Sequence, residues 1–186
     1  MPDLDVRALR IPDIKVITAR KWNDHRGWLS ETFSRRAFAE AGLPFDFFQD
    51  NQSFSIEPGT VRGLHYQTTP WAQDKLIRVL SGRIYDVVVD IRRASTTFLQ
   101  WISYELSADN GHQIFVPAGF AHGFCTLEPS TQVLYKVTNF YAPDHERGIR
   151  WNDPELAIDW PINEDRAIIS EKDAVLPLVR HVKSWF

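Results

Sequence analysis

Cysteine is almost absent from this chain of 186 residues, because Cys125 is the only one. A single thiol excludes an internal disulfide framework and any zinc site that is built from a cluster of cysteines. Since Cys125 lies in an apolar stretch, we expect it to be a small buried side chain rather than a reactive one.

Long apolar runs and clusters of like charge are also missing. No stretch approaches the ~20 apolar residues that a membrane-spanning helix needs, and residues 1–14 mix charged with apolar residues, unlike a secretory signal peptide. The 21 basic and 24 acidic residues give a net charge of -3 and are scattered along the chain. The sequence therefore predicts a cytoplasmic protein that binds a small solute, and neither nucleic acid nor a membrane.

No internal repeat, low-complexity tract or Gly/Ser linker divides the sequence. Its 186 residues, of which 44% are hydrophobic and 13% aromatic, suit one domain with a sizeable core. We expect a single domain over residues 1–186.

One short helix is predicted near the N-terminus. Ser34 is a favourable N-cap, residues 35–41 carry apolar side chains at helical spacing, and Gly42 followed by Pro44 ends the helix. Its shortness indicates a peripheral position.

Between about residues 61 and 141, short β-branched and aromatic runs alternate with turn residues. This pattern is typical of a sandwich or barrel rather than of alternating β-α-β units. The predicted strands are 76–80, 84–91, 99–106, 113–116, 122–127 and 133–138. Turns are expected at Ser81–Gly82 and Ala108–Gly111. The residues after Tyr141 are rich in Pro, Asp, Asn and Trp, and we expect them to wrap the barrel as loops.

Two motifs have the spacing found in the cupin superfamily of jelly-roll barrels. The later motif consists of Gly111, Pro117, Gly119 and His122, and the earlier, incomplete one consists of Gly59 and His65. Metal-binding cupins continue the earlier motif with a second His and a Glu, whereas this sequence has Gln67 and then Trp71 or Ala72. The spacing favours an all-β, cupin-type double-stranded jelly roll, and the replaced ligands predict that no metal is bound.

Residues 62–67 form the densest group of candidate pocket side chains. Arg62 and His65 would face opposite sides of an ideal strand, because side chains alternate along it. If both serve one site, Gly63 marks a β-bulge that re-aims one of them. The alternative is an ordinary half-exposed strand with His65 hydrogen-bonded in the core.

Further motifs follow the order found in one family. They are Asp24–Gly27, Glu31–Phe33, Gln49–Asn51, Arg62–Gln67, Lys75–Val79, Pro117–Phe124, Leu134–Lys136, Tyr141–Pro154 and Ser170–Asp173. With them the chain resembles the dTDP-4-dehydrorhamnose 3,5-epimerases over nearly its whole length. The resemblance implies that the substrate is dTDP-4-dehydro-6-deoxy-D-glucose, whose ketone acidifies the hydrogens on C3 and C5. It also implies acid/base chemistry that needs no cofactor and no metal.

The resemblance assigns catalytic roles to four residues, each of which has a plainer interpretation. His65 matches the base and Asp173 the carboxylate paired with it, although Ser170–Asp173 also suits a helix capping box. Tyr135 matches the acid on the opposite face of the sugar, or else it is an aromatic of the barrel wall. Lys75 matches the cation near the C4 oxygen that stabilises the enolate, or else it is an exposed lysine at a strand end.

The resemblance also implies substrate-binding residues and an assembly. Arg26 and Arg62 suit the diphosphate because guanidinium binds phosphate oxygens bidentately, Tyr141 matches the residue that stacks on thymine, and His122 matches a pocket histidine that orients the substrate. Other matching contacts are Glu31, Gln49, Asn51, Glu146 and Lys172, of which the two glutamates also suit a solvated surface. Relatives are homodimers, so we expect a homodimer.

The favoured hypothesis is an isomerase that inverts C3 and C5 of the dTDP-keto sugar and feeds L-rhamnose synthesis. A relative that inverts only one centre would keep His65 and Tyr135, so the motifs leave it open. Two other classes are a non-catalytic nucleotide-sugar binding module, which the retained base and acid oppose, and a metal-dependent cupin oxygenase, which Gln67 opposes.

Overall fold

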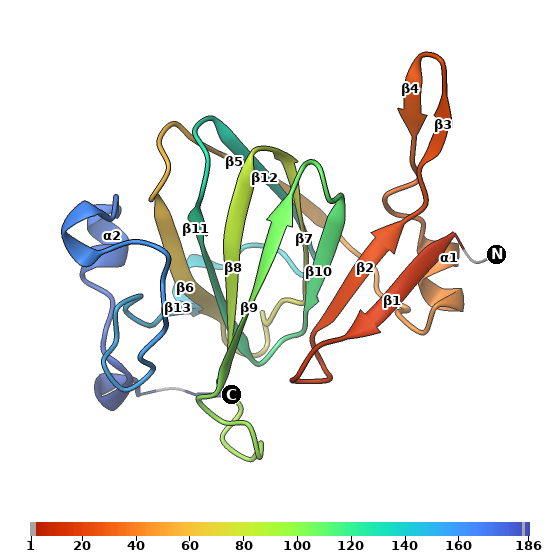
Figure 1. Cartoon of the computed structure of the whole chain (residues 1–186). Helices are drawn as coiled ribbons and strands as arrows, with labels where there is room; N and C mark the ends of the chain where they lie inside the picture. The colour runs from red at the N-terminus through yellow and green to blue at the C-terminus, as the bar shows by residue number, and fades with distance from the viewer. Residues whose placement is uncertain (1–2, 184) are drawn as a thin grey trace.

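The computed structural model describes residues 3–183 and 185–186, and it consists mainly of two antiparallel sheets (Figure 1). The six-stranded sheet contains, from edge to edge, β1 (Leu4–Ala8), β2 (Lys15–Ala19), β10 (His112–Val116), β7 (Lys75–Ser81), β12 (Thr131–Val137) and β5 (Gln49–Ser55). The five-stranded sheet contains β13 (Glu146–Gly148), β6 (Val61–Gln67), β11 (Phe120–Thr126), β8 (Arg83–Asp90) and β9 (Trp101–Ser107). The predicted all-β class is confirmed.

The remaining elements are short. A hairpin of β3 (Trp22–Asp24) and β4 (Gly27–Leu29) precedes helix α1 (Arg35–Glu40). The C-terminal part carries α2 (Glu171–Ala174) and the 3-10 helices η1 (Pro143–His145), η2 (Glu164–Arg166) and η3 (Val179–His181). In the described parts of the chain, no helix is long and apolar enough to cross a membrane.

The two sheets face each other across an apolar interior. Side chains alternate along the strands, so each strand turns one row inward. The interior cluster combines residues of both sheets, including Ile77, Val79, Ile84, Val88, Ile114, Phe124 and Val133.

The outer face of each sheet is covered by a different part of the chain. Helix α1 places Phe38 against Ile17, Leu76 and Phe115 of the six-stranded sheet, and the Ser34 hydroxyl caps it by accepting the Ala37 N–H at 3.5 Å. Residues from the C-terminal loops, including Ile149, Leu156 and Val179, cover the five-stranded sheet. The predicted peripheral helix and the predicted wrapping by the C-terminal loops are confirmed.

The predicted turns are present, but they join strands of opposite sheets. Ser81–Gly82 leads from β7 to β8, and Ala108–Gly111 leads from β9 to β10. Gly82 has φ 77°, a left-handed conformation that favours glycine. The chain therefore crosses from one sheet to the other at these corners instead of forming hairpins.

One strand begins later than the sequence predicts. Strand β9 starts at Trp101 rather than at residue 99, because Leu99 adopts φ 61° at the end of a loop. Ser95 and Thr97 of this loop both donate hydrogen bonds to the Asp90 carboxylate at 2.6 Å. The bonds hold the loop against the end of β8 and keep it out of the sheet.

The β3–β4 hairpin projects away from the two sheets (Figure 1). All six of its strand residues are exposed, and they include Trp28 at 54% and Leu29 at 74% exposure. Large apolar side chains on a projecting hairpin are a recurrent feature of surfaces that meet a partner.

Candidate active site

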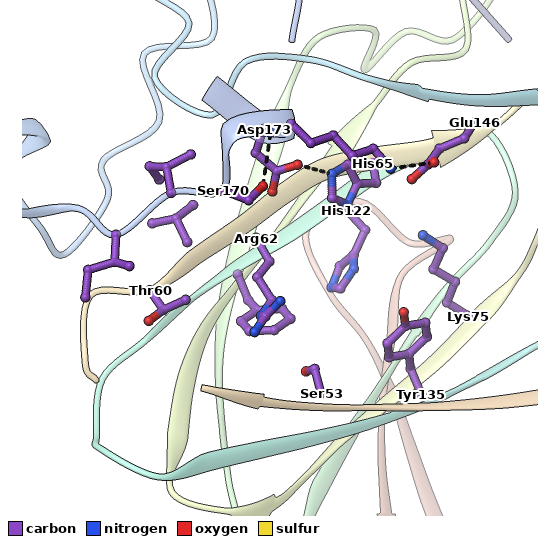
Figure 2. Close-up of a pocket in the computed structure, with 15 residues that line it drawn as sticks. Ser53, Thr60, Arg62, His65, Lys75, His122, Tyr135, Glu146, Ser170 and Asp173 are labelled. Carbon is purple, nitrogen blue, oxygen red and sulfur yellow. Dashed lines mark hydrogen bonds and ion pairs between the residues drawn. The ribbon is translucent and has the colours of Figure 1, made fainter. Parts of the chain in front are cut away.

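A cavity of about 540 Å³ lies among side chains from both sheets and from the segment that leads into α2. The predicted site residues that line it are Arg62, His65, Lys75, His122, Tyr135, Glu146, Lys172 and Asp173. Figure 2 labels all of these side chains except Lys172 and shows the labelled ones converging from opposite walls. The structure thus brings together residues that are far apart in the sequence. His65 and Asp173, for example, are 108 positions apart in the chain.

A bulge in β6 aims both Arg62 and His65 into this cavity. His122 of β11 faces His65, and Phe124 faces Arg62, so β6 has one more residue than β11 between the two pairs. Gly63 has φ 120°, and a Cβ atom there would lie 2.7 Å from the Gly123 Cα atom, so no other residue fits. The predicted bulge at Gly63 is confirmed.

His65 and Asp173 form a hydrogen-bonded pair at one wall of the cavity. The His65 Nε2 atom lies 2.7 Å from Asp173 Oδ1, and Asp173 Oδ2 accepts the Gly63 N–H at 3.1 Å. Burial acts to raise the pKa of Asp173, but the hydrogen bonds and the nearby positive charges outweigh it and hold that pKa below its usual value. An ionised Asp173 fixes the His65 proton on Nε2, which leaves Nδ1 with a free lone pair.

The two interpretations of Ser170–Asp173 are compatible. Ser170 caps α2, since its hydroxyl accepts the Asp173 N–H at 3.1 Å. The Asp173 carboxylate does not complete a capping box, because both of its oxygens bond to β6. The short helix therefore serves to present this carboxylate to His65.

His122 belongs to a second histidine–carboxylate pair that the sequence reasoning missed. Its Nε2 atom lies 2.7 Å from Asp86 Oδ2, and Asp86 is completely buried on the inward face of β8. Burial raises the pKa of Asp86, and the positive charge of protonated His122 opposes this rise. The signal in the sequence was a carboxylate in the middle of the apolar run of residues 84–91, which also contains Asp90 near its end.

Tyr135 and Lys75 come from the opposite wall. They are diagonal neighbours, because Tyr135 faces Ile77 and Lys75 faces Val137 across β12 and β7. Burial lowers the pKa of Lys75 to about 8, although Glu146 and Asp86 favour its charged form. Burial likewise raises the pKa of the Tyr135 hydroxyl. Lys75 is therefore a half-buried cavity residue, and its interpretation as an exposed lysine is wrong.

A polar network forms the edge of the cavity. Lys172 Nζ lies 2.6 Å from Glu146 Oε2, which also accepts the Tyr141 hydroxyl at 2.7 Å. Gln49 accepts the Tyr141 N–H at 3.0 Å and donates to Asn51 Oδ1 at 2.9 Å. Tyr141, Gln49 and Asn51 thus lie beside the cavity, although none of them lines it.

Arg26 and Glu31 are the predicted residues that the fold does not bring to this cavity. Arg26 lies in the turn of the β3–β4 hairpin, where it pairs with Asp24 at 2.6 Å, and Glu31 follows β4. Both are exposed to solvent. Within one chain, therefore, they make no contact with the cavity.

Ser53 is a further cavity residue that the sequence reasoning missed. It lies on β5, and its hydroxyl is buried without a hydrogen-bond partner in the described part of the chain. Arg62 reaches toward β5 from β6 on the other sheet, because its guanidinium donates to the Phe54 carbonyl at 3.0 Å. A free hydroxyl beside a guanidinium suits an anionic oxygen of a ligand.

The residues at the expected metal positions have other tasks. Gln67 donates to the Trp71 and Phe140 carbonyls at 2.6 and 3.1 Å and accepts the Ala142 N–H at 2.8 Å, so its amide holds loops. Over residues 3–183 and 185–186, no three His, Cys, Asp or Glu side chains gather as a metal site would require. Cys125 is buried as expected, and burial raises the pKa of its thiol to about 11.

Comparison with known proteins identifies the family. The family model described as dTDP-4-dehydrorhamnose 3,5-epimerase matches residues 8–181. The dTDP-4-dehydrorhamnose 3,5-epimerase of Pseudomonas aeruginosa is 52% identical over 166 residues, which cover 89% of this chain and 90% of the relative.

Solved structures agree with this match. The Bacillus anthracis dTDP-4-dehydrorhamnose 3,5-epimerase with TDP and PPi bound has a TM-score of 0.92 and 49% identity, covering 95% of this chain and 99% of that one. The Legionella pneumophila dTDP-6-deoxy-D-glucose-3,5-epimerase in complex with dTDP-4-keto-L-rhamnose has a TM-score of 0.91 and 40% identity, covering 96% and 94%. The predicted jelly roll is thereby confirmed, and the chain belongs to the dTDP-4-dehydrorhamnose 3,5-epimerase family.

Proposed function

We propose that this isomerase converts dTDP-4-dehydro-6-deoxy-D-glucose to dTDP-4-dehydro-L-rhamnose by inverting C3 and C5 within the cavity. The observation that carries the proposal is the placement of a base and an acid on opposite walls. His65 lies on β6 of the five-stranded sheet, and Tyr135 lies on β12 of the six-stranded sheet. A sugar ring between them has one face toward each, which is the arrangement that inversion requires.

His65 is the base in this mechanism. The Asp173 carboxylate keeps the proton of the neutral ring on Nε2, so Nδ1 accepts the hydrogen from C3 or C5. Once His65 is protonated, the same carboxylate stabilises the imidazolium at 2.7 Å.

Lys75 and Tyr135 complete the inversion. Removal of the hydrogen turns the ketone into an enolate, whose negative oxygen is stabilised by the Lys75 ammonium in a partly desolvated cavity. Tyr135 then donates its hydroxyl proton to the carbon from the other face. Because the electrons of the broken C–H bond form the new one, no redox cofactor takes part.

The nucleotide half of the substrate is bound by the edge of the cavity. Arg62 and the free hydroxyl of Ser53 suit diphosphate oxygens, and Tyr141, which is 52% exposed, offers a ring face to thymine. His122 lines the cavity and orients the sugar, while Gln49, Asn51, Glu146 and Lys172 supply further contacts. The ligand of the Legionella relative supports this assignment.

A homodimer would explain the position of Arg26 and Glu31. Both are exposed on or beside a projecting hairpin that also carries exposed Trp28 and Leu29. In a dimer these apolar side chains would be covered by the partner, and Arg26 would reach the diphosphate in the partner's cavity. Sedimentation of the purified protein tests this assembly, and a monomer at micromolar concentration would contradict it.

The scattered charge and the buried single thiol support a cytoplasmic location.

Proton NMR of the enzyme with dTDP-4-dehydro-6-deoxy-D-glucose in deuterated water tests the function. We expect deuterium at both C3 and C5 of an L-configured product. Inversion of one carbon alone would favour the single-centre alternative, and neither exchange nor inversion would favour a binding module.

A further inference from the structure

Inversion of two centres requires that the acid, Tyr135, regain a proton after the first inversion and before the second. After the first inversion His65 holds an extra proton and Tyr135 lacks one. His65 is half-buried with a side chain 30% exposed, and Tyr135 is also half-buried, with its ring packed against the interior cluster. While the nucleotide sugar fills the cavity, Tyr135 needs a proton source inside the protein.

The buried pair of His122 and Asp86 has the position for this task. On β11, His122 faces His65 of β6 on one side and Val88 of β8 on the other, and Asp86 is two residues along β8 from Val88 on the same inward face. The side chains of His122 and Asp86 are 9% and 0% exposed. Figure 2 shows the His122 ring within the space that separates His65 from Tyr135 and Lys75.

The hydrogen bonds of the pair leave one ring nitrogen available. His122 Nε2 is engaged with Asp86 at 2.7 Å, and His122 Nδ1 bonds to none of the residues that the structure describes. Asp86 Oδ1 likewise has no hydrogen-bond partner among them. A carboxylate that is buried among apolar side chains favours a protonated partner, since the pair is then neutral overall.

We propose that Asp86 is a positioning residue that keeps His122 as an internal proton donor, and that His122 recharges Tyr135 between the two inversions. This inference rests on the proposed roles of His65 and Tyr135. Protonated His122 gives its Nδ1 proton to the Tyr135 phenolate, which becomes a hydroxyl again. Neutral His122 then takes the proton that His65 removed from the sugar, and His65 becomes a free base. The net change is the transfer of one proton from His65 to Tyr135, with no other reactant.

The test is a single-turnover experiment with Asp86→Asn and excess enzyme, in which the singly and doubly inverted sugars are separated over time. A neutral amide in place of the carboxylate cannot hold the imidazolium, so we expect a first inversion within about threefold of the wild-type rate and a second inversion slower by about a hundredfold, the lower end of what a positioned proton donor supplies. The singly inverted sugar should therefore accumulate. His122→Gln keeps a polar side chain but cannot relay a proton. Because it also alters a contact to the sugar, its readout is the ratio of the second to the first inversion rate, which should fall by about a hundredfold and which stands in for Asp86→Asn if that variant fails to fold.

Val88→Ala is the matched control, because Val88 faces His122 and its truncation loosens the same packing without removing a charge. It should lower the thermal stability and leave the ratio of the two products unchanged. Equal slowing of both inversions in Asp86→Asn and His122→Gln, or no slowing in either, would overturn the relay. Failure of the roles of His65 and Tyr135 would be seen separately, as inversion that survives His65→Asn or Tyr135→Phe.

Discussion

The two histidines of the cavity are held by buried carboxylates, whereas Arg26 of the β3–β4 hairpin is exposed and pairs with another exposed residue of the same hairpin. His65 is fixed by Asp173, and His122 by Asp86, each at 2.7 Å. Arg26 on the hairpin pairs with Asp24, two residues away, and its side chain is 78% exposed. The difference indicates a division of tasks, in which rigid groups perform proton transfer and the hairpin contributes affinity. Each of the following changes tests that division, from the largest expected effect to the smallest.

Removal of the base should have the largest effect. His65→Asn retains a polar side chain next to Asp173 but has no basic nitrogen, so we expect kcat to fall by about 10⁴-fold, the upper end for general base catalysis. A coupled assay and deuterium uptake at C3 and C5 should both show the loss. His112→Asn is the control, because His112 is a half-buried histidine that bonds to Tyr104 away from the cavity; a similar loss there would mean that the assay reports on folding.

Removal of the acid should separate exchange from inversion. Tyr135→Phe keeps the ring that packs against the interior cluster, so the fold should persist while formation of the L-configured product falls by about a hundredfold. Deuterium exchange should continue, because His65 returns a solvent-derived proton to the original face. Inversion of both centres at an unaltered rate would make Tyr135 a wall aromatic, and Tyr104→Phe provides the comparison for a tyrosine outside the cavity.

The pH dependence should report the burial of Lys75. The pKa of this lysine is lowered to about 8 by burial, so its ammonium is present below that pH and is lost as the pH rises through it. Since the enolate needs the cation, kcat/KM should fall by about tenfold for each pH unit above this value. The Lys75→Arg variant keeps its positive charge at these pH values, so its kcat/KM should no longer fall above about pH 8. A fall that persists in this variant would be caused by the titration of another group.

A change on the hairpin should alter binding rather than chemistry. We expect Arg26→Ala to raise KM by about tenfold and to change kcat by less than about threefold, as for a contact that is equally strong in the ground and transition states. Arg35→Ala, which removes an exposed arginine of α1 that is paired with Asp46, is the control. A collapse of kcat would place Arg26 at the reacting carbons.

Mixed dimers would test whether the hairpin of one chain serves the cavity of its partner. If the hairpin serves the partner's cavity, chains with Arg26→Ala and chains with His65→Asn should together form one intact site. At low substrate concentration, co-refolded chains should then exceed the activity of either variant alone. Activity equal to the mean of the separate variants would mean that each hairpin serves its own chain.

Chelation should have no effect. The amide of Gln67 holds three backbone groups, and the two cavity histidines each bind a carboxylate. Full activity after prolonged treatment with a chelator is therefore expected. A loss that one equivalent of a divalent ion reverses would show that the cavity needs more than its own side chains.

The sequence predicts the elements whose side chains are governed by local rules. Ser34 and Gly42 mark α1 because caps act within a single turn. Strand β5, by contrast, is not predicted, because its sequence QDNQSFS is polar on both faces. Ser53 lines the cavity and Asn51 lies beside it, where polar side chains suit a ligand. The polarity that suits the site therefore also removes the alternating pattern by which a strand is predicted.

Long-range pairs explain what else was missed. Asp86 is visible in the sequence only as a carboxylate in an apolar run, and its role depends on the fold, which places it beside His122, 36 residues away. Arg26 had a role only by resemblance, and its place relative to the cavity depends on an assembly that a single chain does not contain. The sequence thus indicated the chemistry at His65 and Tyr135, while the partners that tune each group required the three-dimensional fold.

The close approach of Gly63 and Gly123 restricts how this enzyme can evolve. A Cβ atom at Gly63 would meet the Gly123 Cα atom and the His122 carbonyl oxygen at 2.7 Å, and one at Gly123 would lie 2.7 Å from the Arg62 carbonyl oxygen. The obstacles are main-chain atoms, which every substitution elsewhere retains. No compensating side chain can therefore open either position, and descendants that acquire new sugars must do so around two fixed glycines.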